Sequence, residues 1–289
     1  MTTLDRAAHN QRIADYFDKN YHAMRLFWTN GQSLALHFGY WEEGTRTDAE
    51  AQLNTNRQLA IRAGVKPGQK ILDAGCGIGG SAIWLAENYA VEVFGITISG
   101  DQVRRATENA AKRGVSHLAK FAQQDFTKID APDASFDVLW ALETASCALD
   151  KGELFAEWFR VLKPGGTLVM SDGMRRKRPY ADEDEALLKR FLAGWAIPDL
   201  VTPDELVTAV NGAGFADVVF EDVSERAEPS MQRLYEISRK LLPMSRFLNA
   251  IGLLSAFNLQ SAQGSYDQYI AYKRGLCGYA FYSARKPVV

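Results

Sequence analysis

The sequence has 289 residues, of which 47% are hydrophobic, and its 33 lysines and arginines nearly balance 35 acidic residues, for a formal net charge of −2. A chain of this length and composition can bury one large core, and without a long basic tract it is not expected to bind nucleic acid as its main partner. Cys76, Cys147 and Cys277 lie far apart without metal-ligand spacing, which argues against a disulfide framework or a zinc site and favours a reducing cytoplasm.

The first two thirds of the chain predict a sheet covered by helices. Residues 1–66 are rich in aromatic side chains, and we expect them to form a helical lid. Short apolar runs then alternate with helical patterns; the runs are KILDAG, VEVFGITI, KFAQQD, FDVLWAL and TLVMSD. Alternating β and α units predict a doubly wound, mostly parallel α/β sheet, which binds ligands at the carboxyl ends of its strands.

The last third completes one single domain. A polar helix near 180–197 and a helix capped by Thr202 lead to a sixth strand, ADVVFEDVS, so that residues 67–224 form the core. Residues 225–275 read as a helical substrate cap, and 276–289 contain a seventh strand. The apolar stretch FLNAIGLLSAFNL in the cap is about half the roughly 20 residues of a spanning helix, so we expect no stable membrane insertion. The oligomeric state stays open.

The turn after the first strand carries the most specific motif, Asp73-Ala-Gly75-Cys-Gly77-Ile-Gly-Gly. Its G-x-G-x-G spacing differs from the dinucleotide pattern G-x-G-x-x-G, and Asp73 would repel a pyrophosphate but can hold an ammonium group. Here the chain resembles the class I S-adenosylmethionine-dependent methyltransferases. The resemblance implies a Rossmann-like methyltransferase fold, S-adenosylmethionine as cofactor, and Asp73, Gly75 and Gly77 in its site. An NAD-dependent oxidoreductase and a non-enzymatic binding protein are the alternatives.

The second strand leads into a second motif of this resemblance. Thr97, Ile98 and Gln102 match GxTxSxxQ, a variant found in tocopherol, sterol and isoprenoid methyltransferases and in cyclopropane fatty acid synthases. The resemblance implies that Thr97 and Ile98 line the cofactor pocket and that Gln102 binds the ribose. The spacing from Ser99 to Gln102 is also that of a helix capping box, which requires no ligand.

The third and fourth strands end in further cofactor candidates. The resemblance assigns Asp125 to the adenine amino group and Phe126 to the face of the adenine ring. It also places Leu142, the residue before Glu143, in the cofactor site. An acidic residue in a loop is commonly only solvated, so the position of Asp125 after a strand carries this assignment.

The candidate catalytic residues follow from the same group of enzymes. These enzymes have a glutamate at the position of Glu143, beside the reactive methyl, where a carboxylate can stabilise a carbocation or help to remove a proton. The segment LHFGYW resembles an aromatic turn that closes over their cofactor. This implies that His37 accepts a proton and that Tyr40 and Trp41 contact substrate. Packing in the core is the alternative for these aromatics.

The resemblance implies an enzyme that methylates a small hydrophobic acceptor, with a carbon of an isoprenoid or related natural product as the first choice. An N- or O-methyltransferase is the second. A cyclopropane synthase is the third, and Leu36-His37-Phe38 departs from the Tyr-Ser-Cys of those enzymes. The run Arg175–Arg178 is either a solvated loop or a site for a diphosphate group of the acceptor. Such a diphosphate would bring magnesium, whereas methyl transfer itself needs no metal.

Overall fold

One seven-stranded sheet organises residues 3–27 and 33–288, the part of the chain that the computed structural model describes. Its strand order is β3-β2-β1-β4-β5-β7-β6, and the pairing is parallel except at β7, which runs antiparallel to β5 and to β6. The strands are β1 (Lys70–Ala74), β2 (Glu92–Thr97), β3 (Ala119–Gln123), β4 (Phe136–Leu142), β5 (Leu162–Arg175), β6 (Ala216–Asp222) and β7 (Cys277–Arg285). The predicted doubly wound, mostly parallel α/β sheet is confirmed.

Alternating apolar residues of the central strands build a core on each face of the sheet. Ile71 and Val138 pack with helices α2 and α3 on one face, whereas Leu72 and Leu139 pack with α5 and α7 on the other. Successive strand residues point to opposite faces, so a strand with near-continuous apolar sequence is buried on both sides. The helices are α2 (Asp48–Ala63), α3 (Gly80–Tyr89), α4 (Gly100–Lys112), α5 (Lys151–Val161) and α7 (Pro203–Gly212).

The two helices within residues 1–66 have different roles, although the sequence predicts both as parts of one N-terminal lid. Helix α1 (Thr3–Phe27) contacts α9, whereas α2 packs on β5 and β7 and is a layer of the core. The difference has a local cause, since the buried side of α2 carries Leu59, Ala60 and Ala63, which join the core cluster of the sheet. Only the part of 1–66 that precedes α2 is therefore available as a lid.

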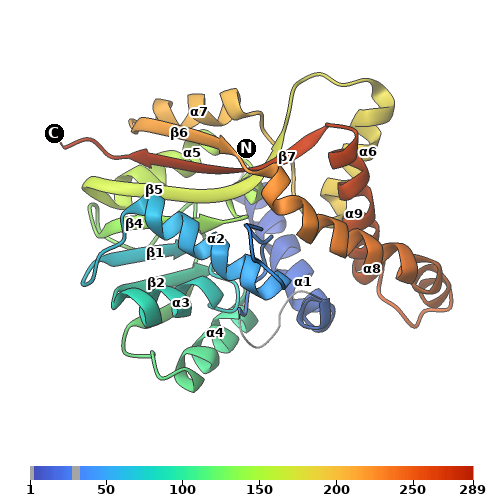
Figure 1. The fold of residues 1–289 in the computed structure, drawn as a ribbon, viewed down its shortest axis with the longest axis horizontal. Helices are drawn as coiled ribbons and strands as arrows, with labels where there is room; N and C mark the ends of the chain where they lie inside the picture. The colour runs from blue at the N-terminus through green and yellow to red at the C-terminus, as the bar shows by residue number, and fades with distance from the viewer. Residues whose placement is uncertain (1–2, 28–32, 289) are drawn as a thin grey trace.

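The cap is built from α6 (Asp182–Gly194), α8 (Ser224–Ala250) and α9 (Ala256–Lys273), and a short helix η1 (Ala145–Cys147) follows β4. Helices α6 and α9 cross closely, because a Cβ on Gly194 would lie 2.4 Å from the Cα of Gly264. Helices α8 and α9 connect β6 to β7, and Figure 1 shows them projecting beyond the sheet. Over the described ranges, none of the helices is long and apolar enough to cross a membrane.

Candidate cofactor and acceptor site

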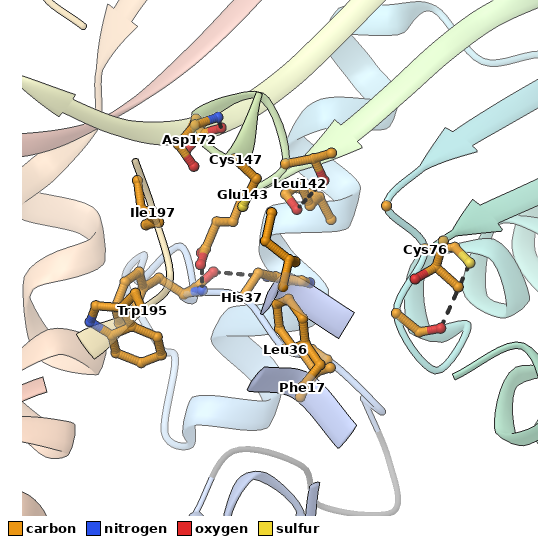
Figure 2. A pocket seen from close by; sticks show the side chains of 18 of the residues that line it. Phe17, Leu36, His37, Cys76, Leu142, Glu143, Cys147, Asp172, Trp195 and Ile197 are labelled. Atoms are coloured by element: carbon orange, nitrogen blue, oxygen red, sulfur yellow. Dashed lines mark hydrogen bonds between the residues drawn. The ribbon is translucent and has the colours of Figure 1, made fainter. Parts of the chain in front are cut away.

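One large cavity lies at the carboxyl ends of the parallel strands (Figure 2). It encloses about 1350 Å³, part of which is open to solvent. Its lining combines residues predicted for the cofactor with apolar side chains of α1 and of the α6 region. Ten of the residues predicted for the site line it: His37 from the segment before α2, and Asp73, Gly75, Gly77, Thr97, Ile98, Gln102, Phe126, Leu142 and Glu143 from the strand ends and the segments that follow them.

Asp73 is a buried acid with an unsatisfied oxygen. Its side chain is 2% exposed, and Oδ2 has no hydrogen-bond partner among the described residues. Burial raises the pKa of Asp73 to about 7, and a hydrogen bond from the backbone of Ala82 opposes this rise. A buried carboxylate oxygen without a partner is costly, and a cationic ligand in the cavity would satisfy it. Asp73 therefore fits the ammonium group of S-adenosylmethionine.

The glycine turn exposes bare backbone beside Asp73. Gly75 has a φ of +82°, and a Cβ on it would lie 2.3 Å from Oγ1 of Thr144. Both the left-handed conformation and the close contact exclude a side chain, so glycine is required. The turn is held by the backbone N–H groups of Gly75 and Cys76, which both donate to the carbonyl of Ile96. This rigid turn brings the backbone of Gly75 and Gly77 into the cavity lining.

The second motif combines helix capping with a cavity contact. The Ser99 hydroxyl accepts a hydrogen bond from the backbone N–H of Gln102 (3.0 Å) and thereby caps α4. The side chain of Gln102 does not return to the cap, because its Oε1 accepts a hydrogen bond from Oγ1 of Thr97 (2.6 Å). Thr97 and Gln102 are thus held together at the cavity, with the Gln102 amide N–H group available to a hydroxyl-bearing ligand.

Phe126 and Asp125 are placed differently. Phe126 lines the cavity, but Asp125 is not among its lining residues. One Asp125 oxygen accepts a hydrogen bond from the side chain of Asn10 on α1 (2.6 Å), and the other accepts from the backbone N–H and hydroxyl of Thr127. An adenine amino group would therefore have to share an oxygen of Asp125 with Asn10.

Glu143 stands in a strained conformation at the end of β4. Its φ is +51°, which costs of order 1–3 kcal/mol in a residue other than glycine and is common at functional sites. Oε1 accepts hydrogen bonds from the backbone N–H of Phe38 (2.6 Å) and the hydroxyl of Tyr279 (2.8 Å). Burial raises the pKa of Glu143 to about 8, these two hydrogen bonds oppose the rise, and the nearby charge of Asp172 adds to it.

His37 lies against the same cavity and is fixed in one tautomer (Figure 2). Its Nδ1 lies 3.0 Å from the carbonyl oxygen of Phe38. A carbonyl only accepts hydrogen bonds, so Nδ1 carries the proton and Nε2 carries the lone pair. Nε2 is buried and has no partner within the described ranges, and burial lowers the pKa of His37 to about 4. His37 is therefore a neutral imidazole with a free nitrogen lone pair, and the burial that lowers its pKa also makes that nitrogen a weaker base.

Tyr40 and Trp41 do not line the cavity. The ring of Tyr40 stacks on Phe281 with 5.6 Å between centroids, and Nε1 of Trp41 donates to the hydroxyl of Ser230 (3.0 Å). The prediction that both contact substrate is thus corrected: the segment runs across β7 and α8, and its aromatics pack there. His37 is the part of LHFGYW that reaches the cavity.

Carboxylates pair with all three arginines of the run that begins at the end of β5. Arg175 is paired with Glu185 and Asp199, Arg176 with Asp222, and Arg178 with Asp199 and Glu205. Within the described part of the chain, no arginine or lysine lines the cavity, and no group of three acidic, histidine or cysteine residues could hold a metal. The structure gives no support to a diphosphate site here.

Sequence reasoning missed several lining residues. Tyr279 comes from β7, and Phe191 and Trp195 come from the region of α6, so long-range folding alone brings them to the cavity. Asp172 is different, because it follows the apolar run of β5 in the same way as Asp73 follows the apolar run of β1. An acid directly after such a run, in the carboxyl-terminal part of a strand, was a usable signal.

Comparison with known proteins agrees with this geometry. Residues 72–170 match the methyltransferase domain family. The chain is 32% identical over 259 residues to 27-O-demethylrifamycin SV methyltransferase of Amycolatopsis mediterranei (strain S699), covering 87% of this chain and 90% of that protein.

Two solved structures share the fold. The [4+2]-cyclase SpnF superposes with a TM-score of 0.79 at 26% identity and covers 97% of both chains. The geranyl diphosphate C-methyltransferase of Streptomyces coelicolor A3(2), in complex with Mg²⁺, geranyl diphosphate and S-adenosyl-L-homocysteine, superposes with a TM-score of 0.73 at 16% identity, over 96% of this chain and 97% of that one. Together with the glycine turn and the buried Asp73, these similarities show that the chain belongs to the class I S-adenosylmethionine-dependent methyltransferases and uses S-adenosylmethionine.

Proposed function

We propose that this methyltransferase methylates a hydroxyl oxygen of a neutral, mainly apolar natural product. The observation that carries the proposal is the free, buried Nε2 of His37, because a hydroxyl must lose its proton as its oxygen is methylated. The relative from Amycolatopsis mediterranei, whose name places its methyl group on an oxygen, supports the same reading. The free state of all three cysteines favours the cytoplasm as the place of this reaction.

The charge of the cavity supports a neutral acceptor. Asp73, Glu143 and Asp172 line it, and burial raises the pKa of each acid. With no lysine or arginine among the described lining residues, a phosphate would be buried beside carboxylates without a counter-charge. A phosphorylated acceptor, such as the geranyl diphosphate bound by the Streptomyces coelicolor neighbour, is therefore disfavoured for this chain.

The walls of the acceptor side are apolar. Helix α1 contributes Tyr16 and Phe17, and the segment that includes α6 contributes Phe191, Trp195 and Ile197. We assign α1 as a lid and α6 with α9 as the cap of the acceptor pocket, since elements of both contact the same cavity. These walls match a large apolar acceptor and exclude water from the reacting groups.

The predicted cofactor residues each have a role in this proposal. Asp73 holds the ammonium group, Thr97 and Gln102 bind the ribose hydroxyls, and Asp125 binds the adenine amino group. The remaining cofactor contacts are the backbone of Gly75 and Gly77 and the side chains of Ile98, Phe126 and Leu142. S-adenosylmethionine, when bound, supplies an electrophilic methyl group on a sulfonium.

Glu143 and His37 act on the acceptor hydroxyl from two sides. Phe38 links them, because its backbone N–H donates to Glu143 while its carbonyl accepts from His37. Glu143 orients the hydroxyl, and His37 takes its proton. Holding the acceptor in an attack pose between the two groups supplies much of the rate.

Carbon methylation of an isoprenoid double bond is the second candidate, and Glu143 favours it. A carboxylate that lines a mainly apolar cavity can stabilise a carbocation, and His37 would then remove a proton from carbon. The two candidates make different products from different acceptors.

The test is methyl transfer from ¹³C-methyl S-adenosylmethionine to three acceptor sets: apolar polyketide or phenolic alcohols, unphosphorylated isoprenoids and prenyl diphosphates. Carbon NMR separates O-methyl from C-methyl products. His37→Asn removes the basic nitrogen, and we expect turnover of the alcohols to fall by about 10²–10⁴-fold while cofactor affinity is unchanged. The exposed His117→Asn is the matched control. Methylated prenyl diphosphate, or full activity of His37→Asn, would contradict the proposal.

A further inference from the structure

The end of α8 carries a row of exposed apolar side chains. Leu241, Met244 and Phe247 follow at three-residue spacing on one side of the helix, and Ile251 and Leu253 continue the row into the turn before α9. Met244 and Phe247 are 58% and 59% exposed, and Leu253 is 74% exposed. We call these five residues the apolar tip. Figure 1 shows that the α8–α9 end projects beyond the sheet, so the tip is presented away from the core. Contiguous exposed apolar surface commonly marks an interaction site.

Basic side chains of α8 lie beside the tip. Residues 237–266, which lie between Glu236 and Asp267, contain Arg239, Lys240 and Arg246 and no aspartate or glutamate, for a net charge of +3. The rest of the chain has 30 basic and 35 acidic residues, a net charge of −5. Arg246 donates to the amide oxygen of Gln263, which leaves its charge uncompensated, whereas Arg239 is paired with Glu236. The charge of this end is thus opposite in sign to that of the remaining molecule.

We propose that the apolar tip docks on an anionic lipid bilayer. An apolar row flanked by lysine and arginine binds in the interface of a bilayer, with its apolar side chains at the acyl boundary and its cations on anionic headgroups. A second copy of the chain is the weaker occupant, because two tips meeting across a two-fold axis would bring like charges together. The docking requires no spanning helix.

Docking at the tip would place the acceptor cavity next to the bilayer. The first turn of α9 contains Phe257, and the ammonium of Lys19 on α1 lies 4.6 Å from its ring centroid. One turn farther along α9, the Ser261 hydroxyl lies 3.2 Å from that of Tyr16, a residue that lines the cavity. These two contacts connect α9, which begins next to the tip, to α1, the helix that covers the acceptor side of the cavity. An apolar acceptor dissolved in the membrane would reach the cavity from there.

The experiment is co-sedimentation of the full chain with vesicles of phosphatidylcholine alone and with equal parts of phosphatidylcholine and phosphatidylglycerol. We expect binding to the anionic vesicles only, and its loss at high salt, because salt screens charges at the surface. Lys240→Glu changes two units of charge and should weaken partitioning roughly 25-fold, at about fivefold for each unit near an anionic leaflet. Phe247→Glu should abolish it.

The matched control is Ile61→Glu on α2, since Ile61 is an exposed apolar residue of a helix (63%) outside the tip. We expect Ile61→Glu to bind vesicles as the parent does, and all variants to keep the parent's unfolding midpoint and its activity on a water-soluble acceptor. Absence of vesicle binding, equal binding to neutral vesicles, or equal loss in Ile61→Glu would overturn the proposal. A dimer detected by light scattering that Phe247→Glu dissolves would overturn it in favour of a second copy.

Discussion

Replacing Glu143 by glutamine should stabilise the ligand-free enzyme at alkaline pH while it slows turnover. The glutamine oxygen can still accept the hydrogen bonds from the Phe38 N–H and the Tyr279 hydroxyl, so the change removes mainly the ionisable proton. The buried carboxyl has a pKa of about 8, compared with an ordinary value of 4.5. Between about pH 4.5 and 8, the Glu143 carboxyl therefore retains its proton in the folded state and releases it in the unfolded state.

The sign and the size of the effect follow from this difference. Below pH 4.5 the carboxyl is protonated in both states and the native stability is complete; it is then lost as the pH rises towards 8. The full pKa shift corresponds to about 5 kcal/mol. Glu143 borders a cavity that water can enter, so we expect a gain of about 1–3 kcal/mol for Glu143→Gln at pH 8 and none at pH 4. At about 2–4 °C for each kcal/mol, the midpoint should rise by several degrees.

Thermal or urea unfolding of the ligand-free parent and of Glu143→Gln, across pH 4 to 9, measures this effect. The control is Glu225→Gln, which changes an exposed glutamate of α8 and should show no such pH dependence. Cofactor affinity by calorimetry should stay close to the parent's, and methyl transfer should slow. A stability difference that is constant across this pH range, or unimpaired turnover, would refute the reasoning about Glu143.

Three further changes test other parts of the site. Tyr279→Phe removes a hydroxyl that lowers the pKa of Glu143, so the acidic limb of the pH–rate profile should move to higher pH; an unmoved limb would remove Tyr279 from the network. Asp73→Asn should weaken S-adenosylmethionine binding at least about tenfold without unfolding the domain, and parental affinity in calorimetry would exclude Asp73. Gly194→Ala places a methyl group against Gly264, and unfolding should show a loss of about 1–3 kcal/mol, with a raised KM for the acceptor but not for the cofactor.

Local sequence patterns predicted the sheet and the cofactor half of the cavity. A strand, a glycine turn and a helix are consecutive in the chain, so the positions of Asp73 and Gly75 follow from adjacent residues. The same holds for Thr97 and Gln102, which are joined across five positions by one hydrogen bond. The cap of α7 could also be predicted from the sequence, because Thr202 and Glu205 form a capping box, which is a local motif.

The acceptor half depends on contacts between distant segments, which local patterns do not contain. Tyr279 reaches Glu143 across 136 positions because β7 inserts between β5 and β6. Tyr40 and Trp41 are residue types common in binding sites, yet both pack outside the cavity. Tyr40 stacks on Phe281, and Trp41 donates a hydrogen bond to Ser230. Aromatic side chains serve core packing and ligand binding equally well, so residue type alone could not separate the two roles.

Two residues that the proposed function needs are costly to the fold. Glu143 has a left-handed backbone, Asp73 has a buried oxygen without a partner, and the pKa values of both are raised by burial. Neither feature helps the ligand-free chain to fold, and the ionised form of Asp73 becomes favourable when a cation occupies the cavity. S-adenosylmethionine brings an ammonium and a sulfonium, whereas its demethylated product has lost the sulfonium charge. Asp73 faces the ammonium, which both forms keep, so the acid that destabilises the empty enzyme is stabilised whenever either form of the cofactor is bound.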